Sequence, residues 1–325
     1  MNEKLPADPR TIDAVILSHG HLDHCGKLPV LTNAGFTGPI YCTNATADVA
    51  RLILLDSADI QLEDAEYLNR RAVPPGSAQI HPLYVPADVQ PVLRQFRKVS
   101  YNQPTDLGGL TFTFYDAGHI LGSAYVLIEW QEEGKTKKLL FTADIGRYNT
   151  PIIHDPHTLP GPVDVVITES TYGMKQHAPM DAVGPALLAA VQQVIKNDSR
   201  LIVPSFAVGR TQTILWYMQQ FISQKKIPAI PVFVDSPMGV DASRIYALHR
   251  GYYDDETASL IGEKDLFGLS HVTFASTGEQ SRQINGQSGP CVIIASSPTC
   301  EFGRVLHHLK LSLERPTRSY ESKES

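Results

Sequence analysis

Three histidines and an aspartate fall within six positions near the start of the chain, in the stretch SHGHLDH at residues 18–24. They follow directly after DAVIL, an apolar run that we expect to form a short buried strand. In a loop, side chains two positions apart can converge on one ion. We therefore expect His19 and His21 to share one metal ion, with Asp23 and His24 turned toward a neighbouring one.

Two later strand ends carry side chains of the same kind. The stretch DAGH places His119 after one predicted strand, and FTAD places Asp144 after another. Imidazoles and carboxylates without thiolates suit zinc best, and manganese or iron stay open. Two ions about 3.5–4 Å apart, bridged by an aspartate, would activate water near neutral pH. A lone histidine is more often a surface or core residue, but three strand ends that all carry ligand types favour a metal site.

Apolar patterning predicts the elements that hold these residues. Alternating or continuous short apolar runs predict strands, and apolar residues at helical spacing predict helices. The last strand of the first half, DVVITES at 164–170, is expected to be buried. The first half is predicted to contain strands at 13–19, 39–43, 110–119, 123–130, 137–146 and 164–170, and helices at 46–72 and 86–96.

After residue 173 the pattern changes to short apolar strands that alternate with helices. A helix at 186–197 is followed by three strand–helix stretches at 200–222, 230–248 and 291–310. This alternation predicts a parallel sheet covered by helices, so the fold class is α/β. We place the domains at 1–172 and 173–311, followed by a polar tail at 312–325 that we expect to be disordered.

The bulk composition excludes several classes of protein. No apolar run approaches the roughly 20 residues that span a bilayer, so no membrane association is expected. The N-terminus MNEKLPADPR has no apolar segment of a secretory signal. The four cysteines are widely spaced and form no CxxC pair, which favours a reducing, cytoplasmic location. The formal net charge of −6 argues against a generally basic nucleic-acid binder, but it leaves room for a local positive site.

Three serines follow strands of the second half and lead toward helices. Helix N-termini present unpaired N–H groups and a partial positive charge, so they attract anions. If the strands are parallel, the three junctions lie along one sheet edge and form a phosphate cradle. The alternative is ordinary N-capping by serine, worth about 1 kcal/mol each. The proposed substrate-binding residues are Ser205, Ser236 and Ser296, with Arg210 and Arg304 as basic partners.

These motifs resemble those of a known family. SHGHLDH, DAGHILGS and FTADIGR resemble the metallo-β-lactamase superfamily. ESTYG at 169–173, PSFAVGRTQ at 204–212 and VDSPMG at 235–240 resemble its β-CASP branch, which contains RNA-processing nucleases similar to the cleavage-and-polyadenylation endonuclease and its bacterial and archaeal relatives. The resemblance covers nearly the whole chain. It implies an αββα metal domain with a β-CASP cap.

The resemblance also implies roles for individual residues. His19, His21 and His119 would hold one zinc ion, Asp23 and His24 the other, and Asp144 would bridge the two. Glu169 resembles an acidic residue that orients a catalytic histidine in the family. We take Asp23 and Glu169 as the candidate catalytic residues.

The sequence departs from the family pattern at both ends. The family has a strand pair before the first histidine motif and two further histidines after the cap, and neither is present between residues 1 and 325. We therefore expect a shortened chain with a weak second zinc site and an exposed sheet edge that promotes self-association. His307 and His308 lie in a predicted helix and are not taken as ligands.

The leading functional hypothesis is a zinc-dependent ribonuclease that hydrolyses single-stranded RNA and is impaired by the shortening. One alternative is a metallo-hydrolase of a small lactam, thioester or phosphodiester. The second alternative is a catalytically weak RNA-binding or assembly subunit. A nucleic-acid-width cap argues against the small substrate, and intact metal ligands argue against a subunit without activity.

Overall fold

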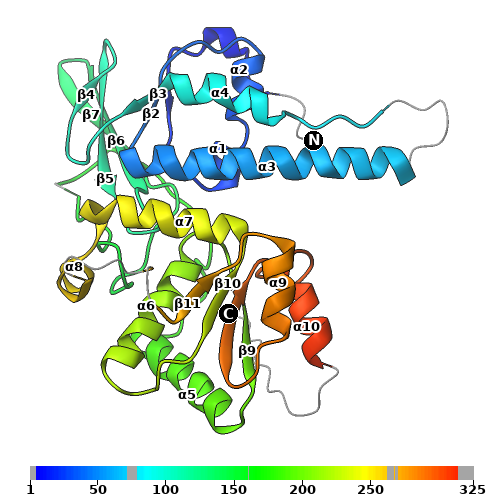
Figure 1. The fold of residues 1–325 in the computed structure, drawn as a ribbon. Coiled ribbons are helices and arrows are strands. Elements are labelled where there is room, and N and C mark those ends of the chain that lie inside the picture. Colours follow the sequence, from blue (N-terminus) through cyan, green and yellow to red (C-terminus); the bar gives the residue numbers. More distant parts are fainter. Residues whose placement is uncertain (1–4, 72–78, 160, 262–266, 268–269, 314–325) are drawn as a thin grey trace. The chain divides into compact units, whose positions relative to one another are not determined.

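The computed structural model describes residues 5–71, 79–159, 161–261, 267 and 270–313. These residues form two compact units, with two sheets in the first and one in the second (Figure 1). The first unit comprises Met1–Arg147 and Asp155–Glu169, and the second Tyr148–His154 and Ser170–Ser325. The domain boundary near residue 172 stays a prediction. Ser312 and Leu313 of the predicted tail belong to the last helix, and the rest of the tail lies outside the described residues.

A small parallel sheet and three helices form the first two layers of the first unit. The sheet has the order β1 (Val15–Ile16), β2 (Ile40–Cys42) and β3 (Phe96–Lys98). One face packs on α2 (Leu28–Asn33), α3 (Asn44–Arg71) and α4 (Pro86–Gln95), through a buried cluster that includes Leu17, Ile40, Cys42, Leu54 and Val92. The strands are short, so most of this core comes from the helices.

A five-stranded sheet forms the third layer. Its order is β4 (Thr105–Asp106), β5 (Leu110–Asp116), β6 (Ala124–Glu132), β7 (Lys135–Phe141) and β8 (Val165–Ile167), antiparallel except between β7 and β8. Side chains alternate between faces, so Tyr41 of β2 points away from Ile40 and packs on Phe112, with 5.2 Å between ring centroids. Loop residues Leu159 and Val163 pack on the outer face.

This order of helices, sheet and sheet agrees with the predicted αββα sandwich in its incomplete form, within the described residues. The predicted burial of the 164–170 strand is wrong. Val165, Val166 and Ile167 are 45%, 52% and 50% exposed. The reason is position, because β8 is the edge strand and has a hydrogen-bonded neighbour, β7, on one side only.

The second unit is built on a parallel sheet, as predicted. Its strands are β9 (Arg200–Pro204), β10 (Val232–Asp235), β11 (Val272–Phe274) and β12 (Cys291–Ala295), arranged in the order β11-β10-β12-β9. Its helices are α5 (Val183–Lys196), α6 (Arg210–Ser223), α7 (Pro237–Leu248), α8 (Asp255–Ile261), α9 (Gly278–Asn285) and α10 (Val305–Leu313). Short 3-10 turns occur in the chain at Pro9–Thr11, Met180–Ala182 and Arg250–Tyr252.

Helices cover both faces of this sheet. Ile202, Phe233 and Ile293 pack with Ile284 of α9 and Val305 of α10. The alternate strand residues are also buried and face the opposite side, where α5 contacts β9 and β12 and α7 contacts β10. With both faces covered, the carboxyl edge of the sheet is left as the place where strand-end side chains meet.

Candidate metal centre

The first histidine motif begins where β1 ends and is fixed from behind by α3. His19 is fully buried. Gly20 lies against α3 so closely that an added Cβ would be 2.7 Å from Val49 Cγ1 and 2.9 Å from the Ala50 nitrogen. Only glycine fits there. The backbone can therefore run close against α3, with His19 just before Gly20 and His21 just after it.

Asp23 and His24 lie on a helix, which corrects the expectation of a loop. His21 is the N-cap of the one-turn helix α1 (Leu22–Cys25). Hydrogen bonds from the Cys25 and Gly26 nitrogens to the His21 and Leu22 carbonyls close that turn, at 2.9 and 2.7 Å. Neighbouring residues on a helix point about 100° apart, so the turn separates Asp23 from His24 and turns His24 toward His19, with 4.0 Å between ring centroids.

Two loops at the end of the five-stranded sheet complete the cluster. His119 follows β5, and its backbone nitrogen donates to Ser123 Oγ at 3.0 Å. Asp144 follows β7 and is held by the next glycine, since Gly146 donates to the Ala117 carbonyl at 2.9 Å. A Cβ on Gly146 would overlap the Gly118 carbonyl, so glycine is required for the two loops to touch.

The three histidines that the sequence assigned to one ion meet at their ring nitrogens. His21 Nδ1 lies 3.2 Å from His19 Nε2 and 3.1 Å from His119 Nε2. Each carboxylate oxygen of Asp144 faces a different group. Oδ2 is 3.6 Å from His19 Nε2 and 3.4 Å from His119 Nε2, and Oδ1 is 3.2 Å from His24 Nε2.

The second predicted set lies beside the first. Asp23 Oδ2 is 3.5 Å from His24 Nε2, and the Asp23 side chain is 77% exposed. His19, His21, His119 and Asp144 form one group of potential ligand atoms, and Asp23, His24 and Asp144 form another, each with all atoms within 4.8 Å of one another. Asp144 is shared by both groups.

Hydrogen bonds alone do not explain this arrangement. A neutral imidazole nitrogen that accepts has one lone pair, yet His21 Nδ1 has two ring nitrogens at hydrogen-bond distance. A tetrahedral ion with ligand distances of about 2.0–2.1 Å separates its nitrogen ligands by about 3.3 Å. The observed 3.1–3.2 Å is close to that separation. The donor set therefore fits a metal ion.

The protonation states also suit metal binding. Burial lowers the pKa of His19 to about 2, helped by the nearby His24, His21 and His119. Burial lowers the pKa of His21 to about 4 and also lowers that of His119, where Asp144 and Glu169 oppose the effect. At neutral pH these rings carry no charge, and the neutral ring is the form that binds metal.

Two outer contacts hold ligands in place. Ser18 Oγ is 3.2 Å from His19 Nδ1, which orients the ring so that Nε2 faces the cluster. Glu169 Oε1 accepts a hydrogen bond of 2.7 Å from the nitrogen of Ile145, the residue after Asp144. Within the described residues, Glu169 therefore braces the loop that carries the shared carboxylate.

The three serines of the second unit gather at one sheet edge, as their places after β9, β10 and β12 require. Ser296 Oγ donates to Ser236 Oγ at 2.8 Å, and the Ser205 nitrogen donates to the Ala295 carbonyl at 3.0 Å. Since β12 lies between β10 and β9, Ser296 occupies the middle.

The expected helix N-termini are present at only one of these serines. Ser236 caps α7 and accepts from the Gly239 nitrogen at 3.1 Å. The N-cap of α6 is Gly209, at φ +85°, and α10 starts at Val305. The predicted junctions at Ser205 and Ser296 are wrong in this respect, because each strand is followed by a loop before its helix begins.

The two arginines differ in their partners. Arg210 is exposed at the start of α6, and its guanidinium makes no hydrogen bond or ion pair with any described residue. Arg304 Nη1 donates to Asp235 Oδ1 at 2.7 Å and to the Ala275 carbonyl at 3.0 Å, and Nη2 donates to Ser276 at 2.8 Å. Arg304 is thus tied into the sheet edge.

A buried polar cluster around Asp235 escaped the sequence reasoning. Asp235 is fully buried at the end of β10 and accepts from Ser281 Oγ at 2.6 Å and His308 Nε2 at 2.7 Å, besides Arg304. Burial acts to raise the pKa of Asp235, but the hydrogen bonds from His308, Ser281 and Arg304 outweigh it and lower that pKa. The available signal was the spacing of four residues between Arg304, just before α10, and His308 within that helix.

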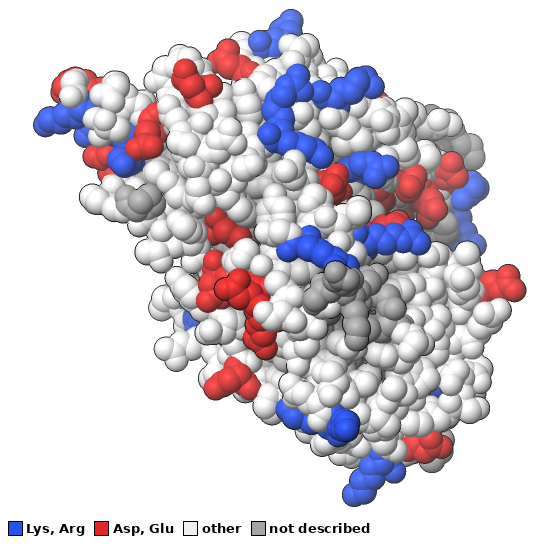
Figure 2. Space-filling model, turned by 60° about the vertical axis from the view of Figure 1, so that its left-hand side comes forward, with Lys and Arg blue, Asp and Glu red and all other residues white. Residues whose placement is uncertain are grey.

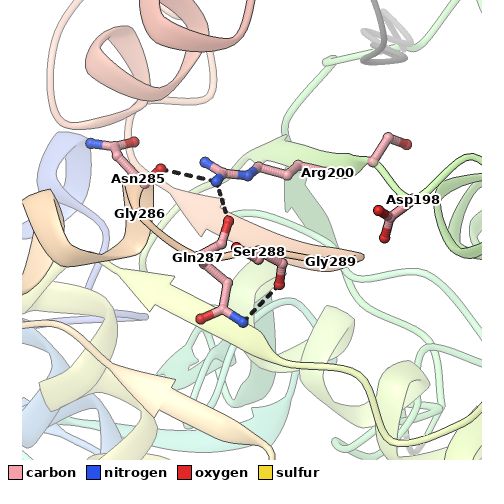
Figure 3. A pocket seen from close by; sticks show the side chains of 8 residues that line it. Asp198, Arg200, Asn285, Gly286, Gln287, Ser288 and Gly289 are labelled. Atoms are coloured by element: carbon pink, nitrogen blue, oxygen red, sulfur yellow. Dashed lines mark hydrogen bonds between the residues drawn. The ribbon is translucent and has the colours of Figure 1, made fainter.

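A polar hollow of about 240 Å³ lies at the opposite, amino end of the same sheet (Figure 3). The Arg200 side chain reaches across it, and Nη2 donates to the carbonyls of Asn285, at 2.9 Å, and of Gln287. The Asn285 carbonyl ends helix α9, where the helix dipole is negative, and Gln287 follows just beyond the C-cap Gly286. Arg200 therefore serves as a helix C-cap, and the hollow is explained by structure.

Comparison with known proteins agrees with these observations. A family model for a metallo-β-lactamase superfamily domain matches residues 3–150, and one for a Beta-Casp domain matches residues 211–319. The two models cover the metal cluster and most of the parallel sheet. The chain carries a metallo-β-lactamase superfamily domain and a Beta-Casp domain, as the sequence motifs predicted.

Similar curated proteins include ribonucleases. The chain is 32% identical over 310 residues to "Ribonuclease TTHA0252" of Thermus thermophilus, which covers 95% of this chain and 66% of that protein. It is 32% identical to "Transcription termination factor FttA" of Methanosarcina mazei, and the match covers 94% of this chain and 46% of that protein. It is 29% identical to "Cleavage and polyadenylation specificity factor 73" of Drosophila melanogaster, and the match covers 90% of this chain and 40% of that protein.

The chain thus spans 40–66% of the length of these relatives. Membership of the superfamily implies a divalent metal, and the His/Asp cluster of the first unit is a group that can hold one. Among the described residues, no helix combines the length and the apolar character that crossing a bilayer requires.

Proposed function

We propose that the chain is a zinc-dependent ribonuclease that hydrolyses phosphodiester bonds of single-stranded RNA. The observation that carries the proposal is the convergence of His19, His21, His119 and Asp144 on one point, with Asp23 and His24 beside them. The ribonuclease relatives support RNA as the substrate.

The proposal assigns two ions. His19, His21 and His119 would hold the first, Asp23 and His24 the second, and Asp144 both. Imidazole and carboxylate ligands without thiolate favour zinc, with manganese as the alternative that elemental analysis distinguishes. The second set has three ligand groups among the described residues, and one of them, Asp23, is exposed. We therefore expect weaker binding at the second set.

When bound, such ions polarise a phosphoryl oxygen and lower the pKa of a water molecule. Hydrolysis joins the oxygen of water to phosphorus, breaks the bond to one ribose oxygen, moves one proton from the water and gives one to the departing oxygen. Asp23 is the exposed carboxylate beside the cluster and is proposed to accept the first proton. Glu169 is proposed to act on Asp144 through its hydrogen bond to Ile145, as a positioning residue.

We propose that Ser205, Ser236 and Ser296 contact RNA phosphates together with Arg210, whose guanidinium has no ion pair with a described residue. Arg304 was also assigned to phosphate, and any such contact would add to its existing bonds to Asp235, Ala275 and Ser276. On the face drawn in Figure 2, acidic side chains lie among the basic ones. Phosphate binding is therefore expected to be local, in keeping with the net charge of −6.

Two further proposals concern the oligomeric state and the cellular location of the chain. The exposed apolar edge strand β8 favours self-association, because an unpaired edge presents free N–H and C=O groups. All four cysteines are free thiols, which favours a reducing, cytoplasmic location.

Cleavage of labelled single-stranded RNA tests the function. We expect cleavage that chelator abolishes and added zinc or manganese restores, and that Asp144→Ala abolishes. Metal-dependent cleavage of a lactam or thioester without RNA cleavage would support a small-substrate hydrolase. RNA binding without turnover at any metal concentration would support a binding subunit.

Salt titration tests the phosphate contacts separately. Binding of uncleavable RNA should weaken with salt, because phosphate contacts release counterions. Arg210→Ala should weaken binding of all sequences alike and reduce the salt slope by about one. Arg250→Ala, another arginine of the second unit, is the control. Salt-independent binding, or equal effects of the two variants, would contradict the proposed contact.

A further inference from the structure

Helix α3 continues well beyond the core that it packs on. In Figure 1 it runs on past α1, α2 and α4. Ala45 to Ala58 supply most of its buried residues, and beyond Ala58 only Ala65 is buried. We call residues 59–71 the α3 arm; at 1.5 Å per residue it is about 20 Å long.

Among the described residues, the hydrogen bonds that tie the arm to another segment lie on one side of it. Asn69 exchanges two hydrogen bonds of 2.8 Å with the backbone of Ile80, and Gln61 Oε1 accepts from the Leu83 nitrogen at 3.1 Å. These contacts fix an extended segment along the Gln61–Asn69 side of the helix. At 100° per residue, Ile60 and Tyr67 point to a different side.

That outer side carries apolar residues in line. Ile60 and Tyr67 are seven residues apart, which places them two turns apart on one stripe. They are 48% and 51% exposed, and part of the Tyr67 ring faces the Arg71 guanidinium, 5.1 Å from the ring centroid. Single exposed apolar residues are ordinary. Two in register on a projecting helix match the anchor spacing by which a groove or helix recognises an amphipathic partner.

Acidic residues flank this stripe. Asp56, Asp59 and Glu63 lie at spacings of three and four residues, where like charges destabilise a helix. None of the three forms an ion pair with a residue in the described ranges. Burial raises the pKa of Asp56, and the charges of Asp59 and Glu63 raise it further. A cation brought to this face would relieve that repulsion.

We propose that the outer face of α3, from Asp56 to Tyr67, is a docking surface for a basic amphipathic helix of a protein partner. Leucine-like side chains of the partner would cover Ile60 and Tyr67, and its lysines or arginines would face Asp59 and Glu63. RNA does not fit, because the acids repel phosphate. A second copy of the arm does not fit either, because antiparallel pairing through Ile60 and Tyr67 sets Glu63 against Asp64.

The test uses a short fluorescent amphipathic peptide made of leucine and lysine, with binding followed by anisotropy at about 0.15 M salt. The full chain should bind it, and Asp59→Lys with Glu63→Lys should weaken binding about tenfold or more. Ile60→Ser with Tyr67→Ser, which keeps the charges, should weaken it to a similar degree. Amide exchange should show protection by the peptide centred on residues 56–71.

Two controls separate docking from general attraction between opposite charges. Glu132→Lys with Glu133→Lys makes the same charge change on the exposed β6–β7 hairpin and should leave affinity within about twofold. A peptide with serine in place of leucine should bind at least about tenfold more weakly. Equal loss in both charge variants, equal binding of the serine peptide, or a dimer that Ile60→Ser abolishes would overturn the proposal. Circular dichroism confirms that each variant folds.

Discussion

The metal centre of the first unit and the Asp235 cluster of the second both contain histidine and aspartate. They differ in whether the polar atoms find hydrogen-bond partners within the protein. Around Asp235, hydrogen-bond donors of Arg304, Ser281 and His308 face carboxylate oxygens at 2.6–2.7 Å. In the metal centre, His21 Nδ1 lies 3.1–3.2 Å from two other imidazole nitrogens, and its single lone pair or proton cannot satisfy both. One cluster is complete without a ligand, and the other is arranged so that it can hold an ion.

The difference shows how a buried histidine is to be interpreted. A cluster in which every polar atom has a partner holds a fold together, whereas convergent lone pairs form a site that suits a cation. Because both clusters contain histidine and aspartate, residue type alone does not distinguish them. Substitutions that remove one partner should therefore affect stability in the second unit and metal binding in the first.

The largest effect is expected at Asp144. Asp144→Ala removes a carboxylate that faces both ligand groups, so metal affinity should fall by far more than the roughly 10–100-fold typical of an outer-shell loss. Elemental analysis of the purified protein measures it, and His19→Ala should also lower the metal content sharply. Unchanged metal in both variants would refute the assignment, and Asp235→Ala should keep its metal.

The second prediction concerns the stability of the second unit rather than metal binding. Asp235→Ala leaves Arg304 and His308 without their shared acceptor, so the unfolding free energy of the second unit should fall by about 3–5 kcal/mol. Urea unfolding measures it by the fluorescence of Trp216 in a Trp130→Phe background, since the chain has only these 2 tryptophans. Asp241→Ala, which breaks an exposed pair with Arg244, should cost no more than about 1 kcal/mol.

The third prediction concerns the orientation of one ring. Ser18→Ala removes the contact to His19 Nδ1, so the ring loses its preferred tautomer and metal affinity should fall about 10–100-fold. Competition with a chelator of known affinity measures this. Ser18→Thr keeps a hydroxyl and should restore most of the affinity. An equal loss in both variants would mean that Ser18 acts through packing.

The smallest effect is a pH dependence. The pKa of Asp235 is lowered from its ordinary value of 3.8, so its charge stabilises the fold above that value, and this stabilisation is lost as pH falls through the lower folded pKa. Asp235→Asn has no such charge. The difference in unfolding free energy between wild type and this variant should narrow as pH falls below about 3.8. A constant difference in urea titrations at each pH would contradict the ionised state.

Much of the metal centre could be predicted because its signals are local. Spacing within His19–His24 and the strand ends before His119 and Asp144 depend on few residues, and the parallel sheet followed from repeated strand–helix alternation. The turn that makes α1 helical was missed, because one turn leaves no periodic pattern.

The failures share a different cause. Burial of Val166 depends on what covers β8 rather than on the residue itself. An apolar strand at a sheet edge therefore has the same sequence pattern as a buried core strand. The helix start after Ser205 depends on Gly209, whose positive φ sets the cap. The pairing of Asp235 with His308 spans 73 residues, a distance over which local patterns carry no information.

The order of the metal ligands along the chain also matters during synthesis. His21 lies 98 residues before His119, its neighbour in the cluster, and Asp144 comes later still. Between the translation of His24 and of Asp144 a ribosome working at about 5–20 residues per second needs roughly 6–24 s. Throughout that interval the nascent chain has the first four ligand groups, to which His119 is added late, and it lacks the carboxylate that joins them. Metal loading, and any activity that depends on it, is thereby postponed until nearly the whole first unit has been made.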